Sequence, residues 1–339
     1  MSLFTDTLEG KKTERPPMWF MRQAGRVLPN YMKLKEQYSF WQMMQDPKLA
    51  AKVTLMPIED LKTDAAILFS DILVIPYAMG MGLDFTDKGP VFENPLKDAE
   101  NPLSQLNPQP EKLQYIYNAI DEIIKTKPAD IPLIGFCGGP LTVLLYMLQG
   151  LSRKHEFPDA VKYIYQNKET VRELNERIAE LSITYATEQG KHGISAFQLF
   201  ETHAGLIPAD LYLELFMPAV EKISRALKAQ NMPFIFFPKG FGAGIHTVKE
   251  DLCDFYGVDW QTPLHIARKV LPPNIGIQGN IDPRLLYASQ ERIASELSKL
   301  IDFHRQNDKW ILNFGHGFLP DIPYKNARFM TDWLRKADW

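Results

Sequence analysis

Residues 131–152 read IPLIGFCGGPLTVLLYMLQGLS, a stretch of 22 residues without a charged side chain. An uncharged apolar run of this length could span a bilayer as a helix. Proline and glycine divide it at positions 132, 135, 138, 139, 140 and 150, however, and these residues interrupt helices and mark turns. We therefore predict a short buried strand, a tight turn and an apolar helix, which together make one strand-and-helix unit.

The same alternation of short apolar runs and helical periodicity recurs along the chain. The clearest helix places Val171, Leu174, Ile178, Leu181 and Tyr185 three and four residues apart on one face. Eight apolar runs bounded by turn residues predict strands, namely Met18–Met21, Ala65–Phe69, Leu133–Phe136, Ile194–Phe200, Phe234–Phe237, Val258–Trp260, Ile275–Gln278 and Trp310–Phe314.

Four short patterns predict helix starts. Asp46-Pro47, Thr262-Pro263 and Asp282-Pro283 each place a capping side chain before a proline, which fits the first helical position. Thr247 and Glu250 have the spacing of a capping box.

Eight strands alternating with helices over 339 residues are typical of one α/β domain, a (β/α)₈ TIM barrel. The alternative is a doubly wound open sheet. We expect a single domain over residues 1–339, with about 1–15 as a terminal extension whose end is frayed, like the last few residues. The Pro- and Gly-rich segment at about 80–110 predicts a long loop insertion.

Composition narrows the class of protein. The net charge of −3 gives no overall attraction to nucleic acid or to a membrane, so any anion site must be local. Cys137 and Cys253 provide no disulfide framework and favour a reducing compartment. Residues 1–12 contain no apolar run of signal-peptide length, which predicts a cytoplasmic protein.

In a (β/α)₈ barrel the functional side chains lie just past the carboxyl ends of the strands. Polar residues follow five of the predicted strands: Arg22 and Arg26, Asp71, Thr202 and His203, Lys239, and His316.

The residues that follow three of these strands favour the binding of a ligand that carries both anionic groups and N–H donors. Arg22 and Arg26 can each grip a carboxylate bidentately, and Gly25 allows the backbone to approach a ligand closely. Asp71 is flanked by apolar residues, where an unpaired carboxylate is costly unless a ligand satisfies it. His316 lies between two glycines, and a histidine titrates near neutral pH.

The candidate site residues, and Tyr146 in the predicted apolar helix, also have ordinary structural explanations. The arginines could be solvated surface residues, Asp71 or Thr202 could cap a turn or helix, and Tyr146 could be a core tyrosine. The glycine-rich run at 240–244 matches neither the dinucleotide nor the P-loop spacing, and we interpret it as an ordinary barrel loop.

Five blocks together resemble the uroporphyrinogen decarboxylase family, in order and in spacing. They are Met21–Arg26 followed by Leu28-Pro29, Phe69–Leu73, Glu201–Gly205, Gln278–Pro283 and Asn313–Gly317. The match extends from about Pro17 to Pro323, and the arginine block is highly specific.

The resemblance implies a cofactor-free, metal-free (β/α)₈ homodimer of haem biosynthesis. Such an enzyme removes CO₂ from the four acetate side chains of uroporphyrinogen III and yields coproporphyrinogen III. The implied substrate-binding positions are Arg22, Gln23, Ala24, Gly25, Arg26, Asp71, Tyr146, Thr202 and His316. The implied catalytic positions are Asp71, Arg22, Arg26 and His316.

The chain departs from the family pattern at three places. Thr202 stands where many members have serine, and it retains the hydroxyl group. Residues 150–155 replace the family's glycine-rich stretch, and Cys137 and Gly139 occupy positions where alanine is common.

The chemistry predicts a role for each group. Loss of CO₂ leaves an electron pair that needs a sink, and a protonated pyrrole ring supplies one without a cofactor. Asp71 would accept the pyrrole N–H groups and stabilise the ring cation, while the arginines, Tyr146 and His316 would hold carboxylates. Either an arginine or His316 would donate the proton; arginine is the weaker acid.

Two other functions are compatible with the same fold. A corrinoid or coenzyme M methyltransferase would need a zinc site built from His and Cys, and the two cysteines lie 116 residues apart without a His-X-Cys motif. A tetrapyrrole carrier without activity would need only the binding residues.

Overall fold

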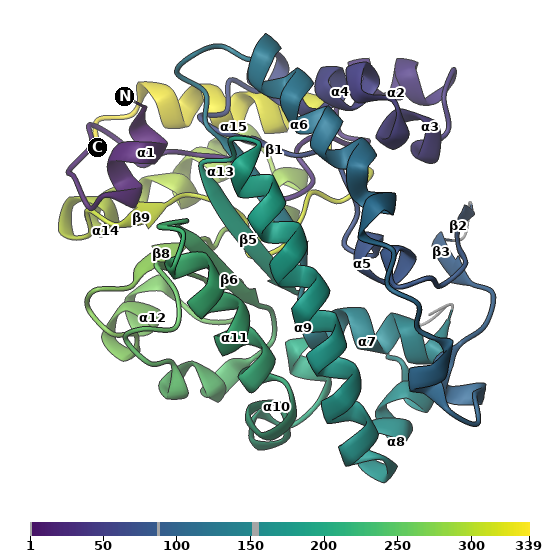
Figure 1. Cartoon of the computed structure of the whole chain (residues 1–339). Helices are drawn as coiled ribbons and strands as arrows, with labels where there is room; N and C mark the ends of the chain where they lie inside the picture. Colours follow the sequence, from purple (N-terminus) through teal and green to yellow (C-terminus); the bar gives the residue numbers. More distant parts are fainter. Residues whose placement is uncertain (1, 87–88, 151–155) are drawn as a thin grey trace.

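The computed structural model describes residues 2–86, 89–150 and 156–339. Within these residues seven parallel strands form one curled sheet (Figure 1), in the order β1 (Ala66–Ile67), β4 (Leu133–Gly138), β5 (Ala196–Glu201), β6 (Phe234–Pro238), β7 (Phe255–Gly257), β8 (Gly276–Gln278) and β9 (Trp310–Ile311). Each strand pairs with its successor along the chain, and the order never reverses. The alternative of a doubly wound sheet, which requires such a reversal, is therefore wrong.

The segment before Arg22 closes the ring between β9 and β1. Met18 forms a parallel bridge with Leu312, and the Leu312 N–H donates to the Pro17 carbonyl at 2.9 Å. On the other side, the Asp64 N–H donates to the Met18 carbonyl at 2.8 Å. The first predicted strand is therefore present only as this bridge, and it completes the (β/α)₈ barrel.

Helices surround the sheet, and short 3₁₀ turns connect several elements. The α-helices are α1 (Leu3–Leu8), α2 (Pro29–Lys35), α3 (Phe40–Gln45), α4 (Pro47–Asp60), α5 (Val74–Ala78), α6 (Gln114–Thr126), α7 (Pro140–Gln149), α8 (Pro158–Gln166), α9 (Lys168–Lys191), α10 (Ala209–Leu215), α11 (Met217–Lys228), α12 (Leu264–Val270), α13 (Gln290–Ser298), α14 (Ile301–Gln306) and α15 (Tyr324–Lys336). The 3₁₀ turns are η1 (Leu96–Asp98), η2 (Pro102–Gln105), η3 (Pro110–Leu113), η4 (Ala204–Leu206), η5 (Gly242–Thr247) and η6 (Pro283–Tyr287). The long helix α9 crosses the front of Figure 1, and its five predicted apolar residues are all buried.

The stretch that begins at residue 131 folds as predicted, into strand β4, a turn and helix α7. Gly139 precedes the helix and Pro140 occupies its first position, where its missing N–H costs nothing. A side chain at Gly138 would place its β-carbon 2.8 Å from the Ile72 carbonyl oxygen, so the close packing at this turn requires glycine. Among the described residues, no helix has the length and apolar character needed to cross a membrane.

The insertion at about 80–110 contains more structure than a loop. It includes an antiparallel hairpin of β2 (Leu83–Thr86) and β3 (Gly89–Phe92), in which Leu83 pairs with Phe92. Three 3₁₀ turns, η1 to η3, follow it before α6. The prolines at 102 and 110 each take the first position of a turn, which accounts for this conformation.

One predicted strand is displaced along the chain. Val258–Trp260 was expected in the sheet, but β7 ends at Gly257. The ladder continues for one more bond, from the Val258 N–H to the Gln278 carbonyl. Asp259 then turns the chain away, because its carboxylate accepts the Gln261 N–H at 2.8 Å. Trp260 therefore lies in the loop past the strand and not within the sheet.

The predicted helix starts have mixed outcomes. Asp46 caps α4 through the Lys48 and Leu49 N–H groups, as predicted. Asp282 also caps as predicted, but the turn it begins, η6, is a 3₁₀ helix. The other two predictions are wrong: α12 begins at Leu264 without a side-chain cap, and Thr247 ends η5 instead of starting a helix.

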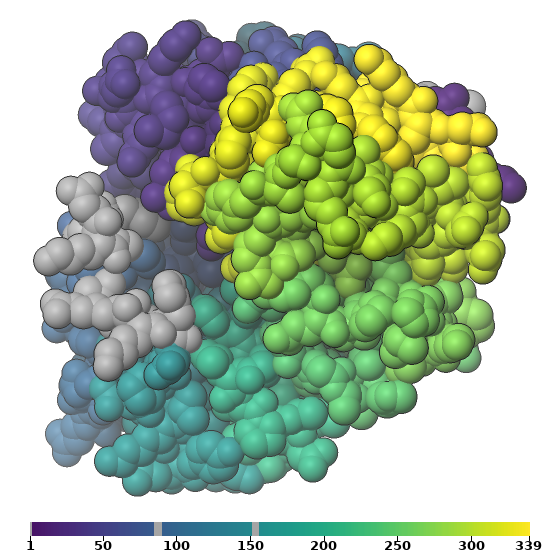
Figure 2. Space-filling model, turned by 180° about the vertical axis from the view of Figure 1, so that it is seen from behind, coloured from purple at the N-terminus to yellow at the C-terminus, as the bar shows by residue number. Residues whose placement is uncertain are grey.

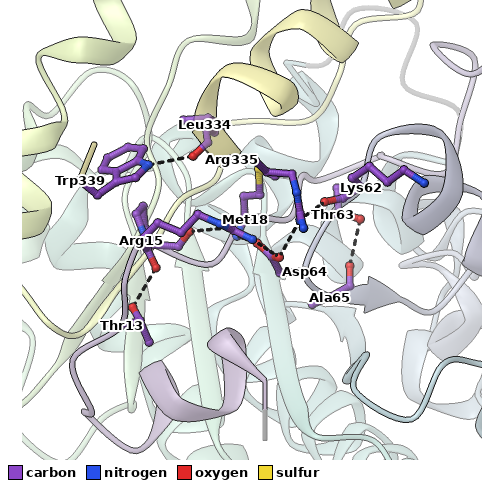
Figure 3. Close-up of polar contacts among 11 residues, drawn as sticks. Thr13, Arg15, Met18, Lys62, Thr63, Asp64, Ala65, Leu334, Arg335 and Trp339 are labelled. Atoms are coloured by element: carbon purple, nitrogen blue, oxygen red, sulfur yellow. Dashed lines mark hydrogen bonds and ion pairs between the residues drawn. The ribbon is translucent and has the colours of Figure 1, made fainter. Parts of the chain in front are cut away.

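Both chain ends pack against the barrel, which corrects the expectation of frayed ends. Helix α1 buries Phe4, and the Trp339 ring lies 6.2 Å from that of Trp310. Asp64 binds Arg15 through two contacts of 2.6 and 2.7 Å and also accepts the Met18 N–H (Figure 3). On the molecular surface the N-terminal and C-terminal segments lie side by side (Figure 2), in agreement with the bridge that closes the ring.

Candidate active site at the barrel mouth

The polar residues that follow the strands gather at the carboxyl end of the barrel. Asp71 comes after β1, Thr202 after β5, Lys239 after β6 and His316 after β9, while Arg22 follows the segment that closes the ring. Because the strands are parallel, these positions surround one mouth.

Arg22 has a left-handed backbone with φ of 61°, which is uncommon for a residue with a side chain. The neighbouring Gln23 holds this turn: its side chain accepts the Phe20 N–H and donates to the Ala65 carbonyl, both at 3.0 Å. Gln23 is fully buried. Its side chain therefore supports the loop and does not line the mouth, where the sequence had placed it as a binding residue.

The rest of the arginine loop offers backbone donors. Within the described residues, the N–H groups of Ala24, Gly25 and Arg26 donate no hydrogen bond to the protein. Ala24 and Gly25 are half-buried, and Arg26 is exposed. Successive unused N–H groups of this kind make a concave site for an anion.

Asp71 is a half-buried carboxylate whose Oδ1 accepts the Leu73 N–H at 2.8 Å. Burial raises the pKa of Asp71 to about 6, against the Leu73 hydrogen bond and the charge of Arg22, which both lower it. Within the described residues Asp71 forms no ion pair. The site thus holds a carboxylate that the protein only partly satisfies.

Arg22, Asp71 and Tyr146 lie close enough to influence each other's ionisation. Burial lowers the pKa of Arg22, while Tyr146 and Asp71 raise it. Burial and the charge of Asp71 raise the pKa of Tyr146 and the charge of Arg22 lowers it, with a net rise to about 12. Arg22 remains open to solvent even though protein atoms crowd it, as is usual for a side chain in a concave mouth.

Glu201, at the end of β5, fixes the helix that carries Tyr146. Its carboxylate accepts the Leu141 N–H at 3.1 Å and the Thr142 N–H at 2.6 Å, at the start of α7. The Tyr212 hydroxyl donates to it at 3.1 Å. Burial raises the pKa of Glu201 to about 7, although these hydrogen bonds lower it. Sequence reasoning missed this role, because Glu201 lies about 60 residues from α7.

Thr202 and His203 follow Glu201, and both are half-buried. The His203 N–H donates to the Thr142 hydroxyl at 3.1 Å, which ties this turn to α7. The His203 ring lies 5.9 Å from that of Tyr146 and 4.9 Å from that of Phe157. Thr202 is thus positioned next to an aromatic cluster on the Tyr146 side of the mouth.

The glycines around His316 serve packing. A β-carbon at Gly315 would lie 2.2 Å from the backbone nitrogen of Trp260, and one at Gly317 would lie 2.6 Å from the Arg22 Cδ. The chain therefore passes tightly between Trp260 and Arg22. The His316 ring lies 5.9 Å from the Trp260 ring.

Trp260 is the second residue that sequence reasoning missed, since it was assigned to a strand. The Lys239 Nζ lies 5.8 Å from its ring centre, and the Arg284 Cζ lies 5.3 Å from it. Trp260 thus joins the loops that follow β6, β7, β8 and β9. An aromatic residue directly after a strand end was the available signal.

Two other features of the described structure bear on ligand binding. A surface cavity of about 510 Å³ between α2, α4 and α6 contains none of the predicted site residues. Within the described ranges, no three His, Cys, Asp or Glu side chains are grouped to hold a metal ion. Of the departures from the family pattern, Gly139 packs against the Glu201 carboxylate and Cys137 is buried in β4, while residues 151–155 lie outside the described residues.

Comparison with known proteins agrees with the motif analysis. A family model described as uroporphyrinogen decarboxylase (URO-D) matches residues 1–337. A protein named uroporphyrinogen decarboxylase from Geobacter metallireducens is 37% identical over 334 residues, which covers 98% of each chain. One of the same name from Francisella philomiragia is 38% identical over 344 residues, again covering 98% of each chain.

Among solved structures, a methyltransferase from Methanosarcina mazei superposes with a TM-score of 0.79 and covers 99% of each chain. Its sequence identity is 16%, so this likeness shows a shared fold and nothing about the reaction.

Proposed function

The chain belongs to the uroporphyrinogen decarboxylase family, and we propose that it converts uroporphyrinogen III to coproporphyrinogen III by removing CO₂ from four acetate side chains. The observation that carries the proposal is the grouping of Arg22, Asp71 and Tyr146, which influence each other's charge at one barrel mouth. The family match over 1–337 also supports treating residues 1–339 as one domain.

The substrate can supply its own electron sink. Protonation of the pyrrole carbon next to the acetate makes an iminium-like ring cation. The bond to the carboxylate then breaks, its electron pair neutralises the ring, and CO₂ leaves. Protonation of the resulting methylene carbon and loss of the ring proton give a methyl group, so each round consumes one proton.

Asp71 is the group that we assign to the ring. One carboxylate oxygen is held by the Leu73 N–H, which leaves acceptor capacity for pyrrole N–H groups. An ionised carboxylate in this partly desolvated position stabilises a positive ring more than it stabilises the neutral ground state. That difference lowers the barrier to protonation.

The arginine loop is suited to the substrate's carboxylates. Arg22 and Arg26 provide charge, and the unused N–H groups of Ala24, Gly25 and Arg26 provide directed donors. Gln23 contributes by holding the loop in place. Tyr146, Thr202 and His316 offer further hydrogen-bonding groups around the mouth.

We assign ring protonation to Arg22 in preference to His316. Arg22 is coupled electrostatically to Asp71, and burial lowers the pKa of its guanidinium, which makes it a better acid than a solvated arginine. His316 follows β9 and lies beside Trp260, and we assign it to binding a carboxylate.

The remaining expectations rest on the family. We propose a cytoplasmic homodimer that needs neither metal nor cofactor and binds neither nucleic acid nor membrane. The net charge of −3 supports the last point, since it gives no general attraction to polyanions.

The experiment that tests the proposal is turnover by the metal-stripped protein. Uroporphyrinogen III is incubated anaerobically, and the products are oxidised and separated by carboxylate number. We expect the series from seven to four carboxylates without added cofactor. An unchanged eight-carboxylate species that still binds would favour the carrier, and the absence of both binding and turnover would reject the proposal.

A further inference from the structure

The backbone that leads into Arg22 leaves the sheet just before it. The Trp19 N–H still donates to the carbonyl of Leu312, the residue directly after β9, at 3.4 Å. The next two N–H groups along the chain, those of Phe20 and Met21, are instead accepted by side-chain amides. Two side chains therefore replace the regular ladder at the point where the chain turns toward Arg22.

The first of these amides belongs to Gln23 and the second to Asn313, which follows β9 by two residues. Asn313 Oδ1 accepts the Met21 N–H at 3.2 Å and the Phe314 N–H at 2.8 Å. Because both partners are N–H donors, the amide oxygen must face them and the amine must face away. One oxygen atom therefore joins the segment after β9 to the residue before Arg22.

The amine of Asn313 shows that this position is not chosen for packing alone. Asn313 is fully buried, and its Nδ2 has no hydrogen-bond partner within the residues that the structure describes. A buried donor without a partner is unfavourable, and few occur in native proteins. Packing alone would favour an apolar side chain of similar size here. The bonds that the amide oxygen accepts account for an asparagine at this position.

Other contacts hold the same two segments together. The Met21 carbonyl accepts the Phe318 N–H at 3.0 Å, so both backbone groups of Met21 are bonded to the segment that follows β9. The rings of Phe20, Phe314 and Phe318 pack against one another, with centroids 4.6, 4.8 and 5.7 Å apart. Arg22, whose backbone is left-handed, therefore extends from a support that is fixed on this side by Met21.

We propose that Asn313 is a positioning residue for Arg22: its amide oxygen holds the Met21 backbone, and thereby sets where the guanidinium lies in the mouth. This inference rests on the proposed function, in which Arg22 protonates the pyrrole ring. A displacement of about 1 Å can lower the rate of such a step about a hundredfold. Because Asn313 is fully buried, it acts through Arg22 and not on the substrate itself.

A double-mutant cycle of Asn313→Ala and Arg22→Gln tests the proposal. The rate constant of the first decarboxylation is measured in anaerobic single turnovers of uroporphyrinogen III, in which slow variants remain measurable. Asn313→Ala should lower this rate constant roughly tenfold or more in the wild-type background and less than about twofold in Arg22→Gln, where the positioned group is already absent. If Arg22→Gln shows no measurable rate, Arg22→Lys takes its place, because a lysine does not reproduce the fork of the guanidinium.

Asn175→Ala is the matched control. Asn175 is also a buried asparagine with one engaged amide atom: its Nδ2 donates to the Leu215 carbonyl at 3.0 Å, and its Oδ1 has no partner within the described part of the chain. It lies on α9, in the outer layer of helices. Asn175→Ala should reduce stability and leave the rate constant of the folded protein at the wild-type value.

If Asn313→Ala does not fold, Asn313→Ser, whose side chain is shorter, permits the same cycle. An equal loss of rate in the wild-type and Arg22 backgrounds, as a general loosening of the fold would produce, would overturn the positioning role. A wild-type rate in Asn313→Ala would also overturn it. Failure of the wild type to decarboxylate would instead overturn the proposed function.

Discussion

Gly317 and Arg22 are in such close contact that a β-carbon on residue 317 would lie 2.6 Å from the Arg22 Cδ and 2.7 Å from its Cγ. Real side chains do not approach so closely. Arg22 also has a left-handed backbone, and Gln23 ties its loop to Ala65. The position of the guanidinium is therefore set jointly by the loops at the beginning and the end of the barrel.

The Gly317→Ala variant should displace Arg22 from this position. Because the arginine backbone is constrained, its side chain must move, and we expect kcat/KM to fall roughly tenfold or more. Thermal unfolding should change little, since the added methyl group displaces a side chain open to solvent. Gly190→Ala on α9 is the control, because Gly190 has no left-handed backbone and the nearest atom that its added β-carbon would meet outside the helix backbone is the terminal methyl carbon of Met232, at 3.2 Å. Wild-type activity in Gly317→Ala would contradict the fit described above.

The decrease in kcat/KM at low pH should reflect protonation of the Asp71 carboxylate. Burial raises the pKa of Asp71 to about 6, and only the ionised carboxylate can accept pyrrole N–H groups and stabilise a ring cation. We therefore expect kcat/KM to fall as the pH decreases through about 6, in the range where the protein stays folded. The residual activity of Asp71→Asn should not show this decrease at low pH. A flat profile down to pH 5 would argue against the assignment.

Glu201 should be essential to the fold around Tyr146. Glu201→Ala leaves two N–H groups of α7 and the Tyr212 hydroxyl without their buried acceptor. We expect a loss of about 3 kcal/mol in the free energy of unfolding, together with reduced activity. Tyr212→Phe removes one of the three bonds and should cost about 1 kcal/mol. Urea titration measures both, and equal stability of the two variants would refute the assigned role.

Asp64, whose contacts Figure 3 shows, should matter for stability but not for catalysis. It precedes β1 and therefore lies at the end of the barrel opposite the mouth. Asp64→Ala leaves Arg15 buried without its partner, and we expect a loss of about 3 kcal/mol or more. Arg335→Gln removes the more exposed contact at 3.4 Å and should cost less than about 1 kcal/mol. Turnover by the folded fraction should match the wild type, and a lower kcat in Asp64→Ala would contradict this separation.

The sequence predicts the barrel wherever local chemistry and tertiary packing agree. Pro132, Gly139 and Gly150 flank β4 and α7 as predicted, whereas Gly135 and Gly138 lie inside β4. Asp46 caps the helix that it precedes. Thr262 and Thr247 carry equally good local signals and fail. The Thr262 carbonyl is held by Asn280, and the Thr247 hydroxyl donates back to the Gly244 carbonyl, so more distant and competing bonds decide their conformations.

The sequence also predicts only part of the candidate site. Arg22 and Asp71 could be selected because strand ends and residue type point to them directly. The structural role of Gln23 and the support from Glu201 depend on partners far away in sequence, at Ala65 and at the start of α7. Trp260 was hidden inside an apolar run, and only the turn at Asp259 places it at the mouth.

The central claim is that the Asp71 carboxylate accelerates decarboxylation by stabilising the positively charged pyrrole ring. The Asp71→Asn variant tests it most directly. Folding raises the pKa of this carboxyl from 3.8 to about 6, so ionisation of Asp71 destabilises the folded state increasingly between these two pH values and fully above about pH 6. Asparagine removes that charge and still offers Oδ1 to the Leu73 N–H, so the Tm at pH 7.5 should be maintained or raised.

The measurement is anaerobic turnover of uroporphyrinogen III by wild type, Asp71→Asn and Tyr146→Phe, with binding of coproporphyrinogen III in parallel. We expect Asp71→Asn to lose about a hundredfold or more in kcat while product binding is largely retained, and Tyr146→Phe to lose under about tenfold. Equal losses of kcat in the two variants, or wild-type turnover by Asp71→Asn, would contradict the account.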